Sequence, residues 1–88
     1  VVMKTCQPCF DLFVDVNNNL YCASPYQHQV IRKSAHTELD TYTIVAGTGI
    51  AGNSSDMLNH PKGIFVDTNL DLYVADTDNN RIQLFIFG

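Results

Sequence analysis

Three cysteines are the most reactive side chains of the sequence. Cys6 and Cys9 form a C-x-x-C pair, and twelve residues separate Cys9 from Cys22. A thioredoxin-type redox pair needs a βαβ unit and a helix N-terminus that lowers the thiol pKa, and the surrounding residues predict neither. A zinc site would need a second pair of ligands, and the only candidates, Cys22 and His28, stand at an unusual spacing. We therefore expect a structural disulfide between Cys9 and Cys22, with Cys6 as the alternative partner.

A Cys9–Cys22 disulfide would require a local distortion of the backbone. The two Cα atoms of such a bridge must lie within about 7 Å of each other. A regular hairpin over these residues does not place Cys9 directly opposite Cys22. We therefore expect a bend or bulge near Asp11.

Asp76, Asp78 and Asn80 have the one-three-five spacing of a calcium-binding loop. The loop also needs Gly at its sixth position and Glu at its twelfth, where this sequence has Arg81 and Phe87. A structural turn is the better interpretation, because a short Asp side chain accepts backbone N–H groups two residues on. We expect Asp76, Asn80 and Arg81 to form this turn, with Arg81 paired to Asp76 or to Asp67.

One further pattern imitates a known site. Gly47, Gly49 and Gly52 spell G-x-G-x-x-G, but the dinucleotide fingerprint needs a helix after the last glycine, and residues 53–59 are typical of turns.

The sequence also lacks a Ser/His/Asp or Cys/His arrangement with supporting context. His28, His36 and His60 are scattered, and we expect solvated or capping roles for them. We therefore predict no catalytic residue, no metal ligand and no cofactor.

Asn53 begins an Asn-Ser-Ser tripeptide, which is an acceptor pattern for N-glycosylation. The tripeptide lies in a glycine-rich stretch that is typical of a surface loop. Together with the cysteine usage, the candidate glycosylation site at Asn53 favours an extracellular or luminal location.

Composition restricts the partners. The 88 residues are 45% hydrophobic and 16% charged, which indicates a folded chain rather than a disordered one. Five Lys and Arg against nine Asp and Glu leave a net charge of −4, which repels phosphate backbones, so we expect no nucleic acid partner. The longest apolar runs, 44–46 and 84–87, are far shorter than the roughly 20 residues of a membrane-spanning helix.

The elements that must position these residues repeat along the chain. Phe13-Val14-Asp15 recurs 52 residues later as Phe65-Val66-Asp67, and Leu20-Tyr21 recurs at the same offset as Leu72-Tyr73. A period of this size falls near the range of propeller blades. The expected strands are short, and Asn- and Pro-containing turns join them. They cover residues 10–16, 20–23, 28–33 and 41–46 in the first copy, and residues 63–67, 71–76 and 81–87 in the second.

Each copy thus reads as a small antiparallel sheet, four-stranded in the first and three-stranded in the second. The fold class is all-β, and the architecture is that of propeller blades. The blades span residues 9–46 and 61–88, the second blade is incomplete, and residues 47–60 form the loop between them. The repeated apolar residues should form the core: Phe13, Val14, Leu20, Tyr21, Ile64, Phe65, Val66, Leu72, Tyr73, Val74 and Ile82.

The second copy closely resembles the NHL repeat, over residues 60–67, 72–77 and 79–82. The first copy is degenerate, because Cys9, Asp11, Ser24 and Gln29 replace the residues equivalent to Pro61, Gly63, Asp76 and Arg81. The resemblance implies a β-propeller, commonly of six blades, whose faces bind protein, peptide or RNA. It also implies the remaining blades of the propeller as partners. Because the sequence begins with Val1 and stops at Gly88 directly after a strand-like run, we expect it to be a piece of a longer polypeptide, with a mature form that lacks its leader as the alternative.

Three functions are compatible with this resemblance. We expect a non-enzymatic scaffold that binds a protein or peptide outside the cell. The first alternative is an enzyme that resembles the metal-dependent peptide-amidating lyases, which need His ligands from several blades, and here His60 is the one candidate. The second alternative is an RNA-binding propeller of the kind fused to ubiquitin-ligase modules, against which the net charge of −4 argues.

Overall fold

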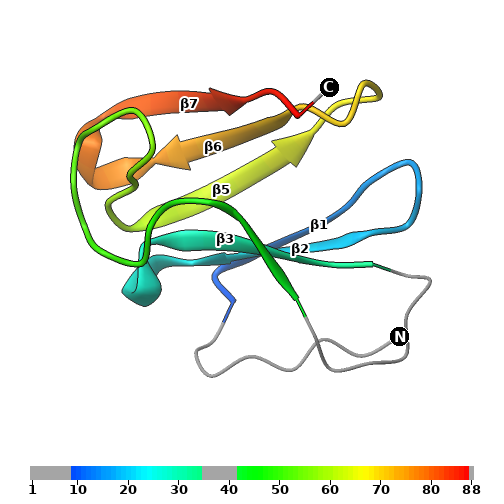
Figure 1. Ribbon diagram of the computed structural model, residues 1–88, viewed down its shortest axis with the longest axis horizontal. Coiled ribbons are helices and arrows are strands. Elements are labelled where there is room, and N and C mark those ends of the chain that lie inside the picture. The colour runs from blue at the N-terminus through cyan, green and yellow to red at the C-terminus, as the bar shows by residue number, and fades with distance from the viewer. Residues whose placement is uncertain (1–8, 35–41, 88) are drawn as a thin grey trace.

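The computed structural model describes residues 9–34 and 42–87, which form an all-β structure with two antiparallel sheets (Figure 1). The first sheet, blade 1, has the order β1-β2-β3-β4, and the second, blade 2, has the order β5-β6-β7. This is the fold class expected from the repeat. The elements are β1 (Asp11–Val14), β2 (Leu20–Ser24), η1 (Pro25–Gln27), β3 (Gln29–Lys33), β4 (Thr43–Ala46), β5 (Pro61–Val66), β6 (Leu72–Asp76), η2 (Thr77–Asn79) and β7 (Arg81–Phe85).

The 52-residue repeat of the sequence is also a repeat of backbone conformation. Phe13 pairs with Tyr21 across β1 and β2, and Phe65 pairs with Tyr73 across β5 and β6. The short 3-10 turns η1 and η2 begin 52 residues apart. Each is followed by a left-handed residue, His28 in blade 1 and Asn80 in blade 2, both with φ of 53°. The two blades are therefore copies of one structural unit.

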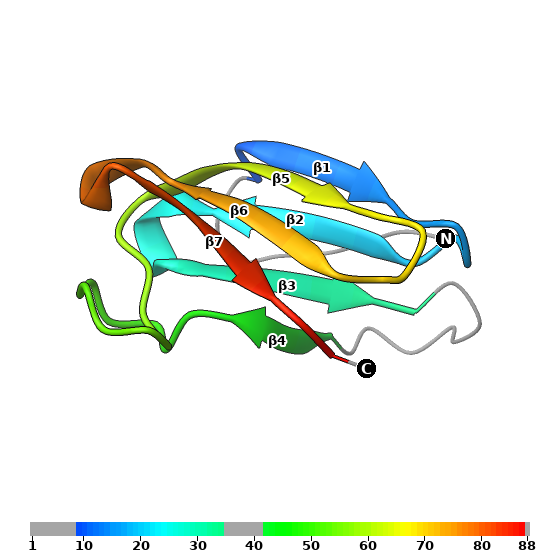
Figure 2. The same cartoon turned by 90° about the horizontal axis from the view of Figure 1, so that it is seen from above.

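Blade 2 lies over blade 1, and the core fills the space between them (Figures 1 and 2). β5 contacts β1 and β2, so the innermost strands of the two blades are neighbours. Side chains alternate along each strand, and the ones that point into the interface are buried. These core residues are Tyr21, Ala23, Val30, Ala46, Leu58, Ile64, Val66, Leu72 and Val74.

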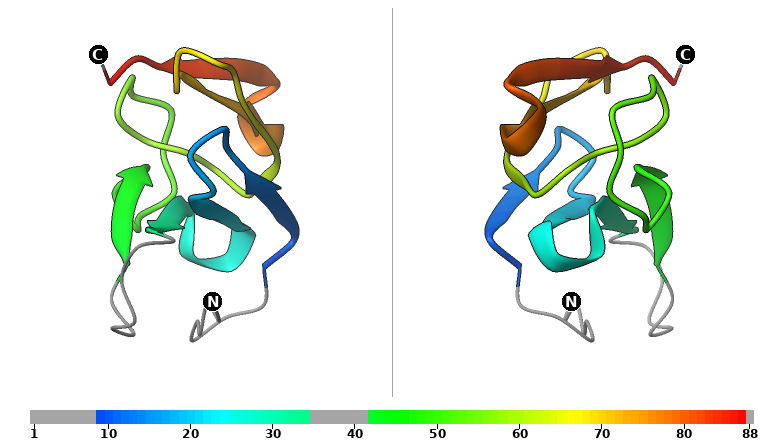
Figure 3. Two further views of the ribbon diagram at one scale, coloured as in Figure 1. Left: turned by 90° about the vertical axis from the view of Figure 1, so that its right-hand side faces the viewer. Right: turned by 90° about the vertical axis from the view of Figure 1, so that its left-hand side faces the viewer.

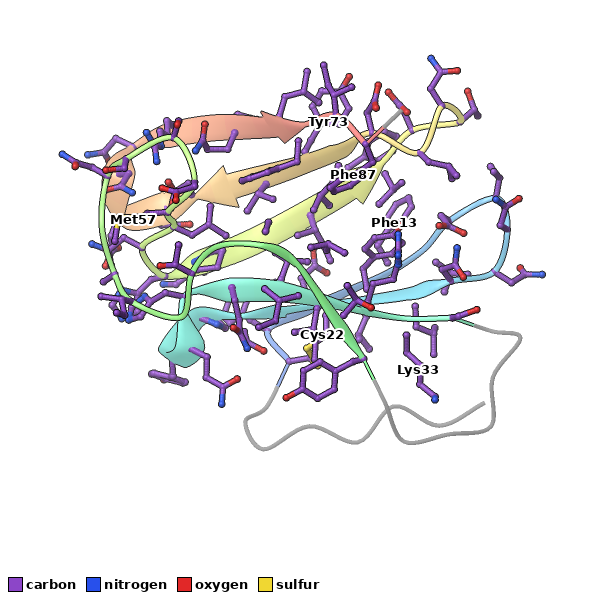
Figure 4. All side chains as sticks on the ribbon, in the orientation of Figure 1. Phe13, Cys22, Lys33, Met57, Tyr73 and Phe87 are labelled. Atoms are coloured by element: carbon purple, nitrogen blue, oxygen red, sulfur yellow. A yellow bond between two sulfur atoms is a disulfide. The ribbon has the colours of Figure 1, made fainter. Side chains whose placement is uncertain are left out.

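Some of the expected core residues lie elsewhere. Val14 is 51% exposed, Phe65 54% and Ile82 68%, because these side chains point away from the interface between the blades. Phe13, which is labelled in Figure 4, is half-buried. Its ring meets the Phe65 ring edge-on, with ring centres 5.2 Å apart. Sequence periodicity identified the strands but could not show which of their faces another sheet covers.

The loop from 47 to 60 connects the outer strand of blade 1 to the inner strand of blade 2 (Figure 3). It begins at Gly47, which has φ of 87°. A Cβ there would lie 2.3 Å from the carbonyl oxygen of His28, so both the backbone conformation and the available space require glycine. Gly47 thus allows the loop to pass from the end of β4 in close contact with the turn after η1.

Candidate functional site

The turns of the molecule gather at two opposite ends. We call the end that carries η1, η2 and loop 47–60 the loop end; it is on the left in Figure 1. The other end carries the turn between β1 and β2 and the turn between β5 and β6. Binding residues are commonly found on loops that a rigid sheet positions. We therefore treat the loop end as the candidate site.

The disulfide between Cys9 and Cys22 lies beside the loop end, and its Cα atoms are 5.3 Å apart. Cys9 precedes β1, and Cys22 lies in the middle of β2. The chain bends at Phe10, whose N–H donates to the carbonyl oxygen of Ala23 at 2.9 Å. This bend, one residue before Asp11, brings Cys9 back toward Cys22.

A shallow pocket next to the disulfide is lined by Cys9, Phe10, Pro25 and Tyr26. Its two aromatic side chains are largely exposed, Phe10 at 63% and Tyr26 at 72%. The ammonium group of Lys62, from blade 2, lies 5.6 Å from the centre of the Phe10 ring. Exposed aromatic rings with a cation nearby can bind an apolar side chain and an adjacent acidic group.

Two histidines meet where blade 1 joins blade 2. The backbone N–H of His60 donates to Nδ1 of His28 at 3.1 Å, and the two rings are perpendicular with centres 4.6 Å apart. His60 Nδ1 also lies 2.8 Å from a carboxylate oxygen of Asp78 and 2.7 Å from the side-chain oxygen of Asn59. Sequence reasoning missed this contact, because the two histidines are 32 residues apart and lie in turns.

The pKa of His28 is lower than that of a free histidine. Burial has the largest effect, the nearby His60 adds to it, and the carboxylate of Asp78 opposes both. The neutral form of His28 is therefore favoured in the folded protein.

Asp76 and Arg81 pair at the turn that the sequence predicted, but the expected hydrogen bond from a backbone N–H of that turn to the Asp76 carboxylate is not formed. Asp76 is fully buried, and Arg81 Nε donates to its carboxylate at 2.8 Å. The second carboxylate oxygen accepts the N–H of Asn59 at 2.6 Å. Asn80 takes the left-handed conformation and closes the turn onto the carbonyl oxygen of Thr77. Arg81 is thus paired with Asp76, and Asp67 serves a different turn.

Arg81 also holds loop 47–60 against blade 2. Its guanidinium donates to three backbone carbonyl oxygens of the loop, those of Asn53, Ser54 and Met57, at distances from 2.9 to 3.0 Å. Asn53, the candidate glycosylation residue, is exposed. The hydrogen bond to Arg81 uses its backbone, so its side chain remains on the surface of a well-anchored loop.

The opposite end is built around Asp15 and Asp67, which sequence reasoning missed. Asp15 Oδ1 accepts the N–H groups of Asn17 and Asn19 at 2.8 and 2.9 Å, and Oδ2 accepts the Tyr21 hydroxyl at 2.9 Å. The Asp67 carboxylate accepts the N–H groups two and four residues on and the hydroxyl of Tyr73. An Asp with Asn two residues later and Tyr six residues later was the available signal.

The remaining candidates give no site. Cys6 and His36 lie outside the described residues. Within residues 9–34 and 42–87, no group of three His, Cys, Asp or Glu side chains is arranged to hold a metal ion. A search of the same residues finds no helix that is long and apolar enough to cross a membrane.

Comparison with known proteins identifies the repeat. Residues 58–85, which include β5, β6 and β7, match the family model of the NHL repeat. The chain is also 35% identical over 74 residues to NHL repeat-containing protein 2 of Bos taurus, covering 76% of this chain and 10% of that protein. The chain thus spans about a tenth of the length of the curated relative it matches. Residues 58–85 thus match an NHL repeat, and the two repeated antiparallel sheets make the chain similar to a segment of an NHL-repeat protein.

Proposed function

We propose that the chain is a non-enzymatic part of an NHL-repeat propeller, and that its loop end binds a protein or peptide partner. The observation that carries this proposal is the pocket lined by Cys9, Phe10, Pro25 and Tyr26. Large exposed aromatic side chains are enriched among the residues that dominate protein interfaces. At 63% and 72% exposure, Phe10 and Tyr26 offer such anchors to a partner.

The pocket is also held rigidly, which favours binding. The disulfide fixes Cys9 to β2, and the hydrogen bond from Phe10 to Ala23 fixes the next residue. On the other side of the pocket, the N–H of His28 donates to the carbonyl oxygen of Pro25 at 3.2 Å and closes η1. A rigid pocket loses little conformational entropy when it binds a ligand.

The scaffold role is supported by the outer face of blade 2. This face presents Phe65, Tyr73, Ala75 and Ile82. Their equivalents in blade 1, which lie 52 residues earlier, are Phe13, Tyr21, Ala23 and Val30, and these pack against blade 2. Because the two faces are equivalent, we infer that the outer face of blade 2 packs against a further blade of the propeller.

The proposed location is extracellular or luminal. Disulfides persist in oxidising compartments and are rare in the cytosol, and the Cys9–Cys22 disulfide fits that chemistry. The exposed Asn53 would then be glycosylated on the surface of loop 47–60.

Binding can be tested by selection of a displayed peptide library on the complete natural polypeptide. We expect selected peptides to bind the wild type, and the variants Phe10→Ala and Tyr26→Ala to lose at least tenfold in affinity. Val16→Ala is the matched control, because Val16 is an apolar residue with 60% exposure in the turn after β1, away from the loop end. Equal binding to all four proteins, or no selected peptide, would refute a binding site in this pocket.

A further inference from the structure

The junction between the blades depends on the protonation state of one nitrogen atom. The N–H of His60 donates to Nδ1 of His28. A backbone N–H can only donate, so Nδ1 of His28 must be the acceptor and carries no proton. A histidine that has taken up a second proton carries hydrogen on both ring nitrogens and cannot accept. Protonated His28 therefore cannot make this hydrogen bond.

The hydrogen bond joins structural elements of both blades. His28 closes η1 in blade 1, and His60 immediately precedes β5, the inner strand of blade 2. Both residues have φ of 53°, an unfavourable backbone conformation for histidine that the surrounding contacts must hold. Gly47 packs against the carbonyl group of His28, so loop 47–60 meets the same turn. A change at His28 therefore acts on the contact between the two blades.

The charges around His28 come from both blades. His60 and Asp78 face it from blade 2, and Asp78 lies against His60 Nδ1 rather than against His28. Tyr26, on the same turn as His28, has its ring centre 6.5 Å from that of His60. A positive charge on His28 would thus lie beside the His60 ring, while the nearest carboxylate is already bonded to His60. The carboxylate of Asp78 favours the protonated His28, but burial and the nearby His60 outweigh it.

We propose that the His28–His60 contact is a pH-sensitive latch, which closes blade 2 onto blade 1 at neutral pH and releases the start of β5 in mildly acidic solution. The direction of the pH dependence follows from the preference of the folded state for neutral His28. The pKa of His28 lies below its ordinary value of 6.5 because of burial and of His60. Its contribution to stability is therefore complete above pH 6.5 and is lost as the pH falls through the pKa of the folded state. This inference does not depend on the proposed binding function.

Hydrogen exchange of the His60 amide in the complete natural polypeptide tests the latch directly. Protection factors are corrected for the intrinsic effect of pH on exchange and are measured from pH 7.5 to pH 5.0. The wild type is expected to lose protection at His60 by up to tenfold for each pH unit between pH 6.5 and the lower pKa of His28 in the folded state, because the latch closes only on the neutral ring. Unchanged protection at His60 across this range would overturn the proposal.

The structure supplies a matched variant, His28→Asn. Asn80 holds the equivalent position of blade 2 in the same left-handed conformation, so asparagine suits this backbone and offers an acceptor that does not titrate. We expect His28→Asn to keep protection at His60 nearly constant with pH. If His28→Asn loses protection as the wild type does, or if His60→Gln abolishes the pH dependence while His28→Asn retains it, His28 is not the switch.

A variant that folds poorly does not prevent the test. The titration of the His28 ring protons in the wild type, followed by NMR, must give a pKa below 6.5 that marks the pH at which the loss of protection at His60 levels off. A His28 pKa at or above 6.5 would overturn the proposal.

Discussion

Asp67 makes in blade 2 the contacts that Asp15 makes in blade 1, 52 residues earlier. Each carboxylate accepts two backbone N–H groups of the turn that follows it, and each also accepts the hydroxyl group of a tyrosine on the next strand. The tyrosine contact is 2.9 Å long from Tyr21 to Asp15 and 3.3 Å long from Tyr73 to Asp67. One carboxylate therefore connects the inner strand, the turn and the second strand of each blade.

Asp15→Ala should destabilise blade 1 more than Asp67→Ala destabilises blade 2. Asp15 is 4% exposed and Tyr21 1%, whereas Asp67 and Tyr73 are only partly buried. Because buried donors without partners are costly, we expect losses of about 3 kcal/mol for Asp15→Ala and about 1 kcal/mol for Asp67→Ala. Hydrogen exchange of the amides in β2 and in β6 measures both losses. Thr68→Ala, an exposed residue of the second turn, is the control, and equal losses in the two blades would contradict this prediction.

The same contacts predict how blade 1 responds to acid. Burial alone would raise the pKa of Asp15, but the hydrogen bonds from Asn19, Tyr21 and Asn17 outweigh it and hold the pKa below the ordinary value of 3.8. The stabilisation is present above pH 3.8 and is lost as the pH falls through the lower pKa of the folded state. The difference in unfolding free energy between wild type and Asp15→Asn should therefore shrink below pH 3.8, as urea denaturation at several pH values would measure. A constant difference would show that the negative charge of the Asp15 carboxylate does not contribute to the unfolding free energy.

These turns show what could be predicted from the sequence and what could not. The 52-residue offset was enough to predict two blades and their strands. The turn at Asp76 could be predicted from the spacing of Asp76, Asn80 and Arg81, because it depends on a local pattern. The roles of Asp15 and Asp67 were missed, although the same spacing of Asp, Asn and Tyr was present in both copies. The His28–His60 contact had no sequence signal, because it depends on how two turns meet after the blades have packed.

Arg81→Lys should release loop 47–60 from blade 2. Arg81 donates to Asp76 and to three carbonyl oxygens of the loop, and a lysine ammonium cannot reproduce this planar set of donors. We expect a local loss of about 2 kcal/mol, because the loop carbonyls and the buried Asp76 carboxylate lose donors. Limited proteolysis between residues 50 and 58 should become faster. Gln83→Ala removes a single hydrogen bond to the same loop, at Ser55, and serves as the control. Equal cleavage of Arg81→Lys and wild type would contradict the role of Arg81.

Blade 1 lacks the Asp76–Arg81 pair that holds loop 47–60 against blade 2. Ser24 and Gln29 stand where blade 2 has Asp76 and Arg81, so neither the carboxylate nor the guanidinium is present. The side-chain amide of Gln29, at the start of β3, donates instead to the side chain of Gln27 at the end of η1. The segment that precedes β1 in blade 1 must therefore be held in place by a different interaction.

The Cys9–Cys22 disulfide supplies this interaction, and we expect its removal to destabilise blade 1 alone. Cys9 occupies the position equivalent to Pro61, where β5 begins in blade 2. Because the bridge closes a short loop of 13 residues, we expect the Cys9→Ser/Cys22→Ser variant to lose about 3 kcal/mol of local stability in β1 and β2. Hydrogen exchange at the Phe10 amide and along β2 should accelerate, while amides in β6 keep their protection. A uniform loss of protection in both blades would show that the disulfide stabilises the whole structure, and would contradict its replacement of the Asp76–Arg81 pair.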